Sequence, residues 1–553
     1  MIQIFVTNMT LTKIYVLIVL VLLKVIPALG NVIYVAPTGN DYNTGDINEP
    51  LESISRAQEL VNPGDTVYIR GGVYNMRIDQ VSQYYSIWAW VTKLSKSGTE
   101  TAPINYWAYP NEKPIFDYTN IKPADKRVIA FYVSGSWLHI KGIEITGVQV
   151  TIKGHTQSEC FRIERGNNNL LEQISMHDGM AIGIYILKGS DNLILNCDAY
   201  RNWDSVSEGG EGGNVDGFGC HVSRGHVNNV FRGCRAWLNS DDGFDLINCD
   251  EPVLIDSCWA FYNGYSEGFI SRGDGNGFKA GGYGGSSFSS LPNPIPINTI
   301  RFCLAVANKQ SGFYSNHHLN GSKWLNNTAY KNKRNFNLLN REAPTEDGYL
   351  KDVPGWGHLM RNNLGYEATY LELANIDKMV CDLSHNYFDL DIEIDDSDFL
   401  SLDESALTAS RKVDGSLPEI TFLHLNSGSD LIDKGINVGF PFKGIAPDLG
   451  CFESDISTQI HLQTEMDNLN FRYYPNPFSK VMEIAFTLNE DSEVDISIIN
   501  LHGNVVRTIG NKRYPKGKNT IFFERNDMPH GAYLLHARLG EVVRTGKFIT
   551  TNE

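Results

Sequence analysis

Three short pieces of sequence decide the fold: NVDGF (214–218), NSDDGFD (239–245) and NGFK (276–279). Each contains a Gly-Phe pair, and the polar residues beside that pair differ from piece to piece. The flanking positions read Asp216, Asp242 and Asn276 before the glycine, and Gly219, Asp245 and Lys279 after the phenylalanine. With Asp241, which precedes Asp242, four carboxylates and one lysine therefore occupy a few positions of successive repeats.

The same repeat continues on both sides of this stretch. Five units begin with Gly-Ile or Gly-Phe and end in Asn: 183–202, 217–239, 243–263, 277–308 and 312–332. Short β-rich segments that recur with Gly and Asn turns, without a helical apolar period, predict a parallel β-helix. Matching residues of neighbouring coils should then stack roughly 4.8 Å apart. We expect Asp216 to lie beside Asp242, and Asp245 beside Lys279, on one face.

Stacked small residues are expected inside the coils. One alanine precedes each closing asparagine by three positions, at Ala199, Ala236, Ala260, Ala305 and Ala329. Four of the nine cysteines also share one repeat position, at Cys197, Cys234, Cys258 and Cys303. No cysteine pair has the CxxC spacing of a zinc or redox site. We therefore interpret the four cysteines as unbridged core residues, because free cysteine packs as a small apolar side chain.

The net negative charge of the chain restricts which ligands it can bind. The chain has 553 residues and a formal net charge of −17, so we expect no nucleic-acid ligand. A polyanionic substrate would also be repelled, unless a metal or a local basic patch intervened. We expect the protein to act as a monomer.

Along the chain, residues 1–30 are expected to be a signal peptide, with the apolar run Ile14–Leu23 and small residues near Gly30 for cleavage. Residues 31–455 are expected to form the β-helix, capped at its start by a short helix with Leu51, Ile54, Ala57 and Leu60 on one face. DLDIEIDDSD (389–398) alternates acidic and apolar residues, as a half-exposed strand does. We interpret its acids as a solvated face.

Residues 456–468 are polar and are expected to be a linker, and 469–553 carry short alternating strands that predict a small antiparallel β-sandwich. The last 80 or so residues resemble the type A sorting domain of the type nine secretion system of Bacteroidetes. The resemblance is carried by YPNPF (474–478), MPHGAY (528–533) and GKFI (546–549). It implies secretion by outer-membrane machinery, removal of this domain, and an extracellular or cell-surface location.

Four carboxylates that converge from two coils would repel one another, and a hard divalent cation removes that conflict. Calcium accepts several carboxylate oxygens in flexible geometry, whereas the alternative is a solvated acidic face or Asx turns. Lys279 lies among glycines, which leaves its surroundings open to a ligand. A nearby metal would allow it to act as a base, and a salt bridge to Asp245 is the structural alternative.

This set of aspartates and the lysine resembles polysaccharide lyase family nine, right-handed parallel β-helix enzymes similar to pectate lyases. The resemblance covers most of 31–455 and is most specific in 214–282. It implies that calcium is held by Asp216, Asp241, Asp242 and Asp245, and that Lys279 is the base. The implied reaction is β-elimination on a uronate polymer, which leaves a 4,5-unsaturated end. An alkaline pH optimum is expected, because Lys279 must be neutral to act.

Further candidates lie in neighbouring coils. Asn276, Tyr314, Asn316 and His317 share or adjoin the lateral position of the site, and we expect them to contact sugars, although Asn276 can equally shape its turn. His317 and His318 are adjacent, so on a strand they would point to opposite faces and would not form a metal pair.

Homogalacturonan (pectate) is the expected substrate of the lyase, and three other functions remain open. The first is a rhamnogalacturonan I lyase. An inverting hydrolase with acid and base at Asp241 and Asp242 is a rival, but the Gly-His-Gly and Arg-x-Lys motifs of polygalacturonases are absent from the sequence. A non-catalytic, glycan-binding surface β-helix would not require Lys279 beside the acids.

Overall fold

The computed structural model describes residues 30–154, 157–343, 350–454, 471–500, 504–540 and 542–551. The predicted linker and all of the predicted signal peptide except Gly30 lie outside the described residues. The chain divides into two compact units. The first runs to Ile394 and includes Ser401–Phe422 and Leu449–Cys451, whereas Asp395–Leu400 and Leu423–Asp448 group with the C-terminal residues.

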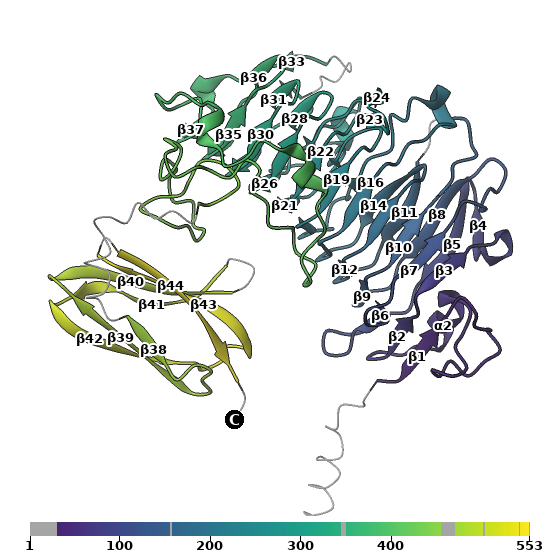
Figure 1. Ribbon diagram of the computed structural model, residues 1–553, viewed down its shortest axis with the longest axis horizontal. Coiled ribbons are helices and arrows are strands. Elements are labelled where there is room, and N and C mark those ends of the chain that lie inside the picture. Colours follow the sequence, from purple (N-terminus) through teal and green to yellow (C-terminus); the bar gives the residue numbers. More distant parts are fainter. Residues whose placement is uncertain are drawn as a thin grey trace, which may run out of the picture. The chain divides into compact units, whose positions relative to one another are not determined.

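The first unit is a parallel β-helix built from three long sheets, as predicted (Figure 1). Its first sheet has twelve parallel strands. They are β1 (Val32–Val35), β2 (Thr66–Ile69), β6 (Ile104–Ala108), β9 (Leu138–Lys141), β12 (Leu170–Glu172), β15 (Leu193–Leu195), β18 (Val230–Arg232), β21 (Leu254–Asp256), β26 (Thr299–Arg301), β29 (Lys323–Leu325), β34 (Leu359–Arg361) and β37 (Asp382–Ser384).

The second sheet has ten strands. They are β3 (Gly72–Asn75), β7 (Pro114–Asp117), β10 (Glu144–Thr146), β13 (Ser175–His177), β16 (Asp198–Tyr200), β19 (Arg235–Trp237), β22 (Trp259–Phe261), β27 (Leu304–Val306), β30 (Thr328–Tyr330) and β35 (Leu364–Tyr366). Its register pairs Ala199 with Ala236, Ala236 with Ala260, Ala260 with Ala305 and Ala305 with Ala329. The alanine repeat seen in the sequence is therefore one buried row of this sheet.

The third sheet, called the site sheet below, carries the acidic stretch and has eleven strands. They are β4 (Gln83–Tyr85), β5 (Trp88–Leu94), β8 (Arg127–Val133), β11 (Ser158–Glu164), β14 (Ala181–Lys188), β17 (Phe218–Cys220), β20 (Phe244–Asp245), β25 (Phe278–Lys279), β28 (Ser311–Tyr314), β31 (Arg334–Asn337) and β36 (Leu371–Ala374). Two short antiparallel hairpins project from the coils, β23 (Tyr265–Ser266) with β24 (Ile270–Ser271), and β32 (Asn340–Arg341) with β33 (Asp352–Val353).

Aromatic rings stacked inside the coils hold the site sheet in register. The phenylalanine of each Gly-Phe pair is buried, and these rings stack with centroids 4.9–5.0 Å apart, from Phe218 through Phe244 and Phe278 to Phe313. Phe336, which follows Asn335, continues the stack at 5.0 Å from Phe313. Burying one such side chain is worth about 1.5–3 kcal/mol. Because side chains alternate along a strand, the residue after each phenylalanine must point outward.

Polar ladders close each coil. The asparagines that end the repeats are buried, and the Nδ2 of each donates to the Oδ1 of the next, from Asn202 through Asn239, Asn263 and Asn308 to Asn332, at 2.9–3.2 Å. These bonds satisfy amides that would otherwise be buried without partners. All nine cysteines lie in the described residues and are free thiols, so the prediction of unbridged core cysteines is confirmed.

The N-terminal cap is the helix α2 (Ile54–Leu60), at the purple end of the chain in Figure 1. Ser53 caps it by accepting a hydrogen bond from the Arg56 amide at 3.0 Å. Leu51, Ile54 and Ala57 are buried, as expected. Leu51 lies before the helix and not on its face, and Leu60, the last helical residue, is 37% exposed, whereas the extended Val61 is buried in the core.

The strand expected over 389–398 does not form. The structure has no strand at these residues, and Asp396–Asp398 make a short 3₁₀ turn. Asp395 caps this turn by accepting a hydrogen bond from the Ser397 amide at 2.7 Å. Local side-chain-to-backbone bonds of aspartate therefore prevail over the alternating pattern.

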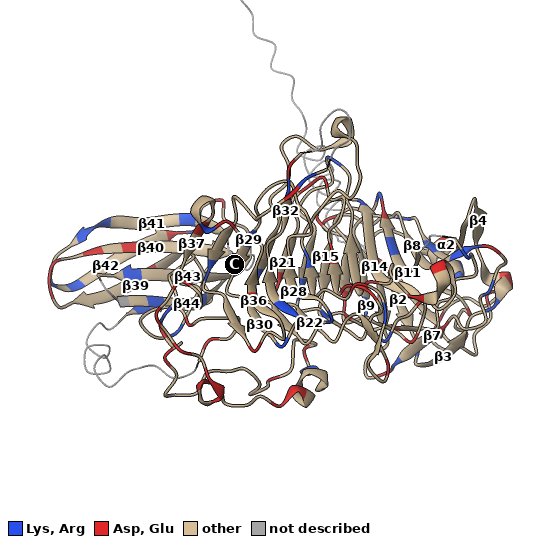
Figure 2. Cartoon of the chain, turned by 90° about the horizontal axis from the view of Figure 1, so that it is seen from above, with Lys and Arg blue, Asp and Glu red and all other residues tan. Residues whose placement is uncertain are grey.

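The C-terminal part of the second unit has two antiparallel sheets around their own core, as predicted. The strands are β38 (Arg472–Tyr474), β39 (Val481–Leu488) and β42 (Gly517–Glu524) in one sheet, and β40 (Ser492–Asn500), β41 (Val505–Tyr514), β43 (Gly531–Leu539) and β44 (Val542–Thr550) in the other. Among the described residues, no helix has the length and apolar character needed to cross a membrane. Acidic and basic residues are interspersed along the strands (Figure 2).

Candidate active site

The site sheet brings the sequence-predicted residues together. Its register pairs Gly219 with Asp245 and Asp245 with Lys279, so these three positions are neighbours in successive coils. Asp216 and Asp242 are also neighbours, because the amide of Asp242 donates to Asp216 Oδ1 at 3.1 Å. The stacking inferred from the repeat alignment is thus present in the structure.

Three carboxylates form a compact buried cluster. Asp216, Asp241 and Asp242 each offer an oxygen within 4.8 Å of the others. Their exposed fractions are 2%, 5% and 0%. Asp242 Oδ1 accepts hydrogen bonds from the backbone and side-chain nitrogens of Asn276, at 2.6 and 2.8 Å. Asp242 Oδ2 is buried and accepts no hydrogen bond from the described residues.

Lys279 is the cation beside this cluster. Its Nζ lies 3.0 Å from Asp242 Oδ2 and 3.1 Å from Asp245 Oδ2, and its side chain is 12% exposed. The contact to Asp242 is a charge contact without hydrogen-bond geometry, whereas the contact to Asp245 is a hydrogen bond. Asp245 Oδ1 accepts from the Ile247 amide at 2.7 Å, so the strand end itself orients this carboxylate.

The charges in the site are unbalanced. Burial raises the pKa values of Asp216, Asp241 and Asp242, and repulsion between neighbouring carboxylates raises them further. Burial lowers the pKa of Lys279, but attraction by the surrounding acids outweighs it and raises that pKa well above its ordinary value. One lysine cannot neutralise four carboxylates, so the residues alone leave excess negative charge in a buried place.

These residues fit a hard divalent cation. All the donors are carboxylate oxygens, three of them converge, and Asp242 Oδ2 is buried with only the charge contact to Lys279 and no hydrogen bond from the described residues. Oxygen-rich, flexible coordination of this kind suits calcium. Asp245 lies outside the group of three and contacts Lys279 at 3.1 Å.

The other four candidates occupy different surroundings. Asn276 is 4% exposed and holds Asp242, and its Oδ1 accepts from the Ser311 amide at 3.1 Å. Asn316 has a positive φ and donates to the Gly281 carbonyl at 2.6 Å, so both asparagines shape backbone. His317 Nδ1 lies 2.9 Å from Asp352 Oδ1. Tyr314 is half-buried and pairs in register with Lys279, so it flanks the site directly.

Three neighbours of the cluster were missed from the sequence. Tyr185 pairs with Gly219 in the site sheet, and its hydroxyl lies 3.1 Å from His221 Nδ1. His221 Nε2 is buried without a hydrogen-bond partner and lies 3.9 Å from Asp245 Oδ2. The Asp274 amide donates to Asp241 Oδ1 at 2.8 Å. The repeat did contain a signal for Tyr185, which occupies the position of Asp245 and Lys279 in the unit that begins at Gly183.

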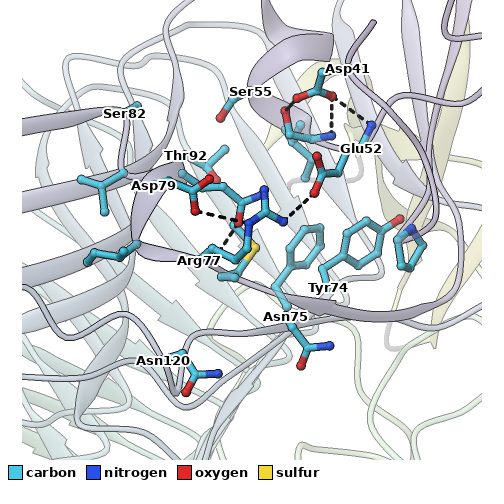
Figure 3. A pocket seen from close by; sticks show the side chains of 18 of the residues that line it. Asp41, Glu52, Ser55, Tyr74, Asn75, Arg77, Asp79, Ser82, Thr92 and Asn120 are labelled. Atoms are coloured by element: carbon cyan, nitrogen blue, oxygen red, sulfur yellow. Dashed lines mark hydrogen bonds and ion pairs between the residues drawn. The ribbon is translucent and has the colours of Figure 1, made fainter. Parts of the chain in front are cut away.

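A cavity of about 820 Å³ lies elsewhere, at the seam between the N-terminal cap and the first coil (Figure 3). Its charged groups are paired with one another or with neighbouring residues. Arg77 pairs with Glu52 at 2.6 Å and with Asp79 at 3.2 Å, and Asp41 accepts from Ser53 Oγ at 2.7 Å. No residue of the carboxylate cluster lines this cavity, so we place the chemistry at the cluster.

Comparison with known proteins gives the family. Residues 33–362 match the family described as "Pel9A-like, right handed beta helix region". The chain belongs to this Pel9A-like family. The Pel9A-like relatives include pectate lyase L of Dickeya dadantii, which is 34% identical over 429 residues, covering 76% of this chain and 90% of that protein. Pectate lyase PEL9 of Emericella nidulans is 28% identical, covering 72% of this chain and 93% of that protein.

Solved structures agree with this assignment. A rhamnogalacturonan lyase is 45% identical with a TM-score of 0.69, over 72% of this chain and 97% of that chain. The crystal structure of pectate lyase Pel9A is 32% identical with a TM-score of 0.62, over 77% and 97%. This Pel9A-like chain is therefore a polysaccharide lyase with a right-handed β-helix. Residues 472–551 match the "Secretion system C-terminal sorting domain", which indicates that the enzyme is secreted.

Proposed function

We propose that this lyase cleaves a uronate-containing pectic polysaccharide by β-elimination, with calcium held at the acidic cluster and Lys279 as the base. The observation that carries the proposal is the position of Lys279 Nζ, within 3.1 Å of both Asp242 and Asp245 and beside three buried carboxylates. A general base and a metal site must be neighbours if both are to act on one sugar.

Asp216, Asp241, Asp242 and Asp245 would hold the calcium ion. When bound, calcium supplies positive charge that stabilises the uronate carboxylate as negative charge develops on it. Hydrogen bonds within the protein already orient two of these carboxylates. Asn276 fixes Asp242 through two hydrogen bonds, and the Asp274 amide fixes Asp241, so the carboxylates need little rearrangement.

Lys279 accepts the proton from C5 of the uronate. The electron pair of the C5–H bond becomes the C4–C5 double bond, and the C4–O bond breaks with its pair leaving on the glycosidic oxygen. Lys279 can do this only as the neutral amine. The acids that hold its pKa high in the metal-free protein are the same ones assigned to calcium, so neutralising them favours the neutral amine.

Two pectic substrates fit this chemistry. The sequence led us to expect polygalacturonate. The 45% identity to a rhamnogalacturonan lyase, against 28–34% for the pectate lyases named above, favours the rhamnogalacturonan I backbone. We therefore propose that backbone as the preferred substrate, with polygalacturonate as the second candidate. We also propose that outer-membrane secretion machinery recognises the sorting domain and that the enzyme acts as a monomer.

The test measures ultraviolet absorbance of the unsaturated product on rhamnogalacturonan I and on polygalacturonate, with calcium or with chelator, for the wild type and Lys279→Ala. We expect a calcium-dependent signal on rhamnogalacturonan I that the variant loses. Saturated products would instead identify a hydrolase. Binding of either polymer without any cleavage, unchanged in Lys279→Ala, would identify a non-catalytic glycan-binding protein.

A further inference from the structure

A groove on the second sheet lies apart from the carboxylate cluster. It encloses about 530 Å³ and is lined by Tyr200 of β16 and Trp237 of β19, both half-buried (Figure 1). Their rings stack with centroids 4.1 Å apart and planes at 6°. Phe261, the next residue of this row, is fully buried. The aromatic row is therefore covered at Phe261 and reaches the surface at the groove.

Two segments that are far apart in the sequence also line this groove. One is the hairpin of β23 and β24, which contributes Glu267 and Phe269. The other is residues 408–410. This segment is fixed to the sheet, because Arg235 Nη1 donates to the carbonyl oxygens of Leu407 and Ala409, at 3.2 and 2.8 Å. Both segments belong to the β-helix unit, so the groove lies within one compact body.

Phe269 presents an apolar ring to solvent in this groove, and the residue is 58% exposed. Its amide donates to the Ser266 carbonyl oxygen at 3.0 Å, so the hairpin turn fixes its backbone. The ring meets that of Tyr262 at a centroid distance of 5.2 Å and an angle of 82°, an edge-to-face contact that leaves ring surface open. An exposed aromatic ring of this kind can pack against the apolar C–H face of a sugar.

The charges along the groove disfavour an anionic ligand. Arg201 Nε donates to Asp178 at 2.7 Å, and Arg235 donates twice to Asp198 at 2.9 Å, so both arginines are already paired with acids. Glu267 is exposed, and its carboxylate accepts no hydrogen bond from the described residues. A uronate would be repelled by Glu267 without gaining a free cation. The hydroxyl groups of an uncharged sugar, by contrast, can donate to this carboxylate.

A second cavity of about 390 Å³ extends the groove. It shares Arg201, Leu238 and Glu267 with the first and continues to Trp203. The cation at this end, Arg272, lies over the Trp203 ring at 3.7 Å, so it too has a partner within the protein. Each cavity falls within the range of about 300–1,000 Å³ that is typical of ligand sites. The groove can therefore receive a short chain of sugars.

We propose that this groove is a second, non-catalytic carbohydrate site that binds an uncharged oligosaccharide. Phe269 and Trp237 supply apolar surface for the sugar rings, and Glu267 accepts hydrogen bonds from their hydroxyl groups. No residue of the carboxylate cluster lines either cavity, so the groove holds sugars without cutting them. The inference goes beyond the proposed function: the site sheet acts on acidic sugars, and the groove holds neutral sugars, such as side branches of a polysaccharide.

The test is isothermal titration of oligosaccharides into the full chain in chelator, so that a calcium-dependent site contributes nothing. The neutral probes are β-1,4-linked galactotetraose and α-1,5-linked arabinotetraose, which separate hexose from pentose chains, and tetragalacturonate is the acidic comparison. The variants are Phe269→Ala and Glu267→Gln. Tyr42→Ala is the matched control, because Tyr42 is 99% exposed in the N-terminal cap and lines neither cavity.

We expect the wild type and Tyr42→Ala to bind at least one neutral probe equally, and Phe269→Ala to bind it about tenfold more weakly, a loss of about 1.4 kcal/mol. Glu267→Gln should also bind more weakly, because a neutral amide oxygen is a poorer acceptor than a carboxylate. The inference would be overturned if neither neutral probe bound, if Phe269→Ala bound as the wild type does, or if tetragalacturonate bound more tightly and Phe269→Ala weakened it. Absence of unsaturated product in the cleavage assay would overturn the proposed function and leave this inference standing.

Discussion

Two buried acidic clusters in the same β-helix have opposite character. In the second sheet, Asp198 receives paired hydrogen bonds from both Arg235 and Arg411, at 2.6–3.1 Å. In the site sheet, four aspartates face one lysine. The first cluster has more cations than acids and the second has fewer. A buried charge with all its partners from the chain serves the fold, whereas a deficit of positive charge implies a ligand that completes it.

The pKa directions express the same contrast. Burial alone would raise the pKa of Asp198, but the hydrogen bonds from Arg235 and the charge of Arg411 place it below its ordinary value. At Asp216, burial and three neighbouring acids all raise the pKa. The two clusters should therefore respond oppositely to mutation, calcium and acid.

The largest effect is expected for the base. Lys279→Arg retains the positive charge beside Asp242 and Asp245 but cannot give up a proton near neutral pH. We expect turnover to fall by about 10²–10⁴-fold, the usual contribution of a general base. Thermal unfolding in chelator should stay closer to the wild type than that of Lys279→Met, which leaves the acids without a cation. An arginine variant that keeps more than about a tenth of the wild-type rate would remove Lys279 from the base role.

The next effect concerns the cluster formed by Asp198, Arg235 and Arg411. Asp198→Asn leaves two arginines buried without their acid, and breaking such a pair typically costs about 3–5 kcal/mol. We expect the free energy of unfolding of the β-helix to fall by that amount, equally with and without calcium, as measured by denaturant titration. A calcium-dependent loss would show that the two clusters are not independent.

Asp216→Asn should have two opposite effects. In chelator it removes one of the repelling buried charges, so the variant should unfold at a higher temperature than the wild type. In calcium the wild type should gain about 2.7 kcal/mol at a hundredfold excess over Kd, and the variant should gain much less. The curves of the two proteins should therefore cross as calcium is added. If the variant is the less stable protein in chelator as well, the carboxylate has a structural role.

The last effect is on the pH dependence of stability. The pKa values of Asp216, Asp241 and Asp242 are raised in the folded, calcium-free protein above about 3.9, the ordinary value for aspartate. Stability from these groups is thus present at low pH and is lost as pH rises through the folded values. Asp198 has the opposite sign, and its contribution is lost as pH falls below about 3.9.

Between neutral pH and about pH 4, the calcium-free protein should therefore become more stable as acid is added, by up to about 1.4 kcal/mol per pH unit for each proton taken up. Calcium should suppress this trend, because a bound cation favours the ionised carboxylates. The other titrating groups are the same in both conditions, so the difference between the two profiles comes from the site. Denaturant midpoints across this range, with calcium and with chelator, measure the difference. Parallel pH profiles in the two conditions would contradict the site account.

Much of the site could be predicted from the repeat. Once the period is known, stacking converts an alignment into neighbours, so Asp216 beside Asp242 and Asp245 beside Lys279 followed from the sequence. The Asp198 cluster could not be found this way, since Arg411 lies 213 residues from Asp198 and outside the repeat. The pair of Tyr185 and His221 depends on Gly219, whose missing side chain leaves room for the tyrosine ring.

Two local patterns misled the prediction. Alternation of acids and apolar residues at 389–398 predicted a strand, but an aspartate cap formed a turn instead. The spacing of Leu51, Ile54, Ala57 and Leu60 predicted one helical face, but the helix begins only at Ile54 and Leu60, its last residue, is 37% exposed. Repeats that stack against copies of themselves were reliable, whereas isolated patterns at the edges of the repeat were decided by local hydrogen bonds.

Isothermal titration of calcium into the chelator-treated protein tests the central claim most directly. Three proteins are compared: the wild type, Asp216→Asn in the carboxylate cluster of the site sheet, and Asp256→Asn. The acid of Asp256 is paired with Arg232 at 2.9 Å and with Arg301 at 3.0 Å. We predict that the wild type and Asp256→Asn bind calcium with similar affinity, and that Asp216→Asn loses at least about tenfold, or 1.4 kcal/mol. Equal calcium affinity in all three proteins, or no calcium binding by the wild type, would contradict the account.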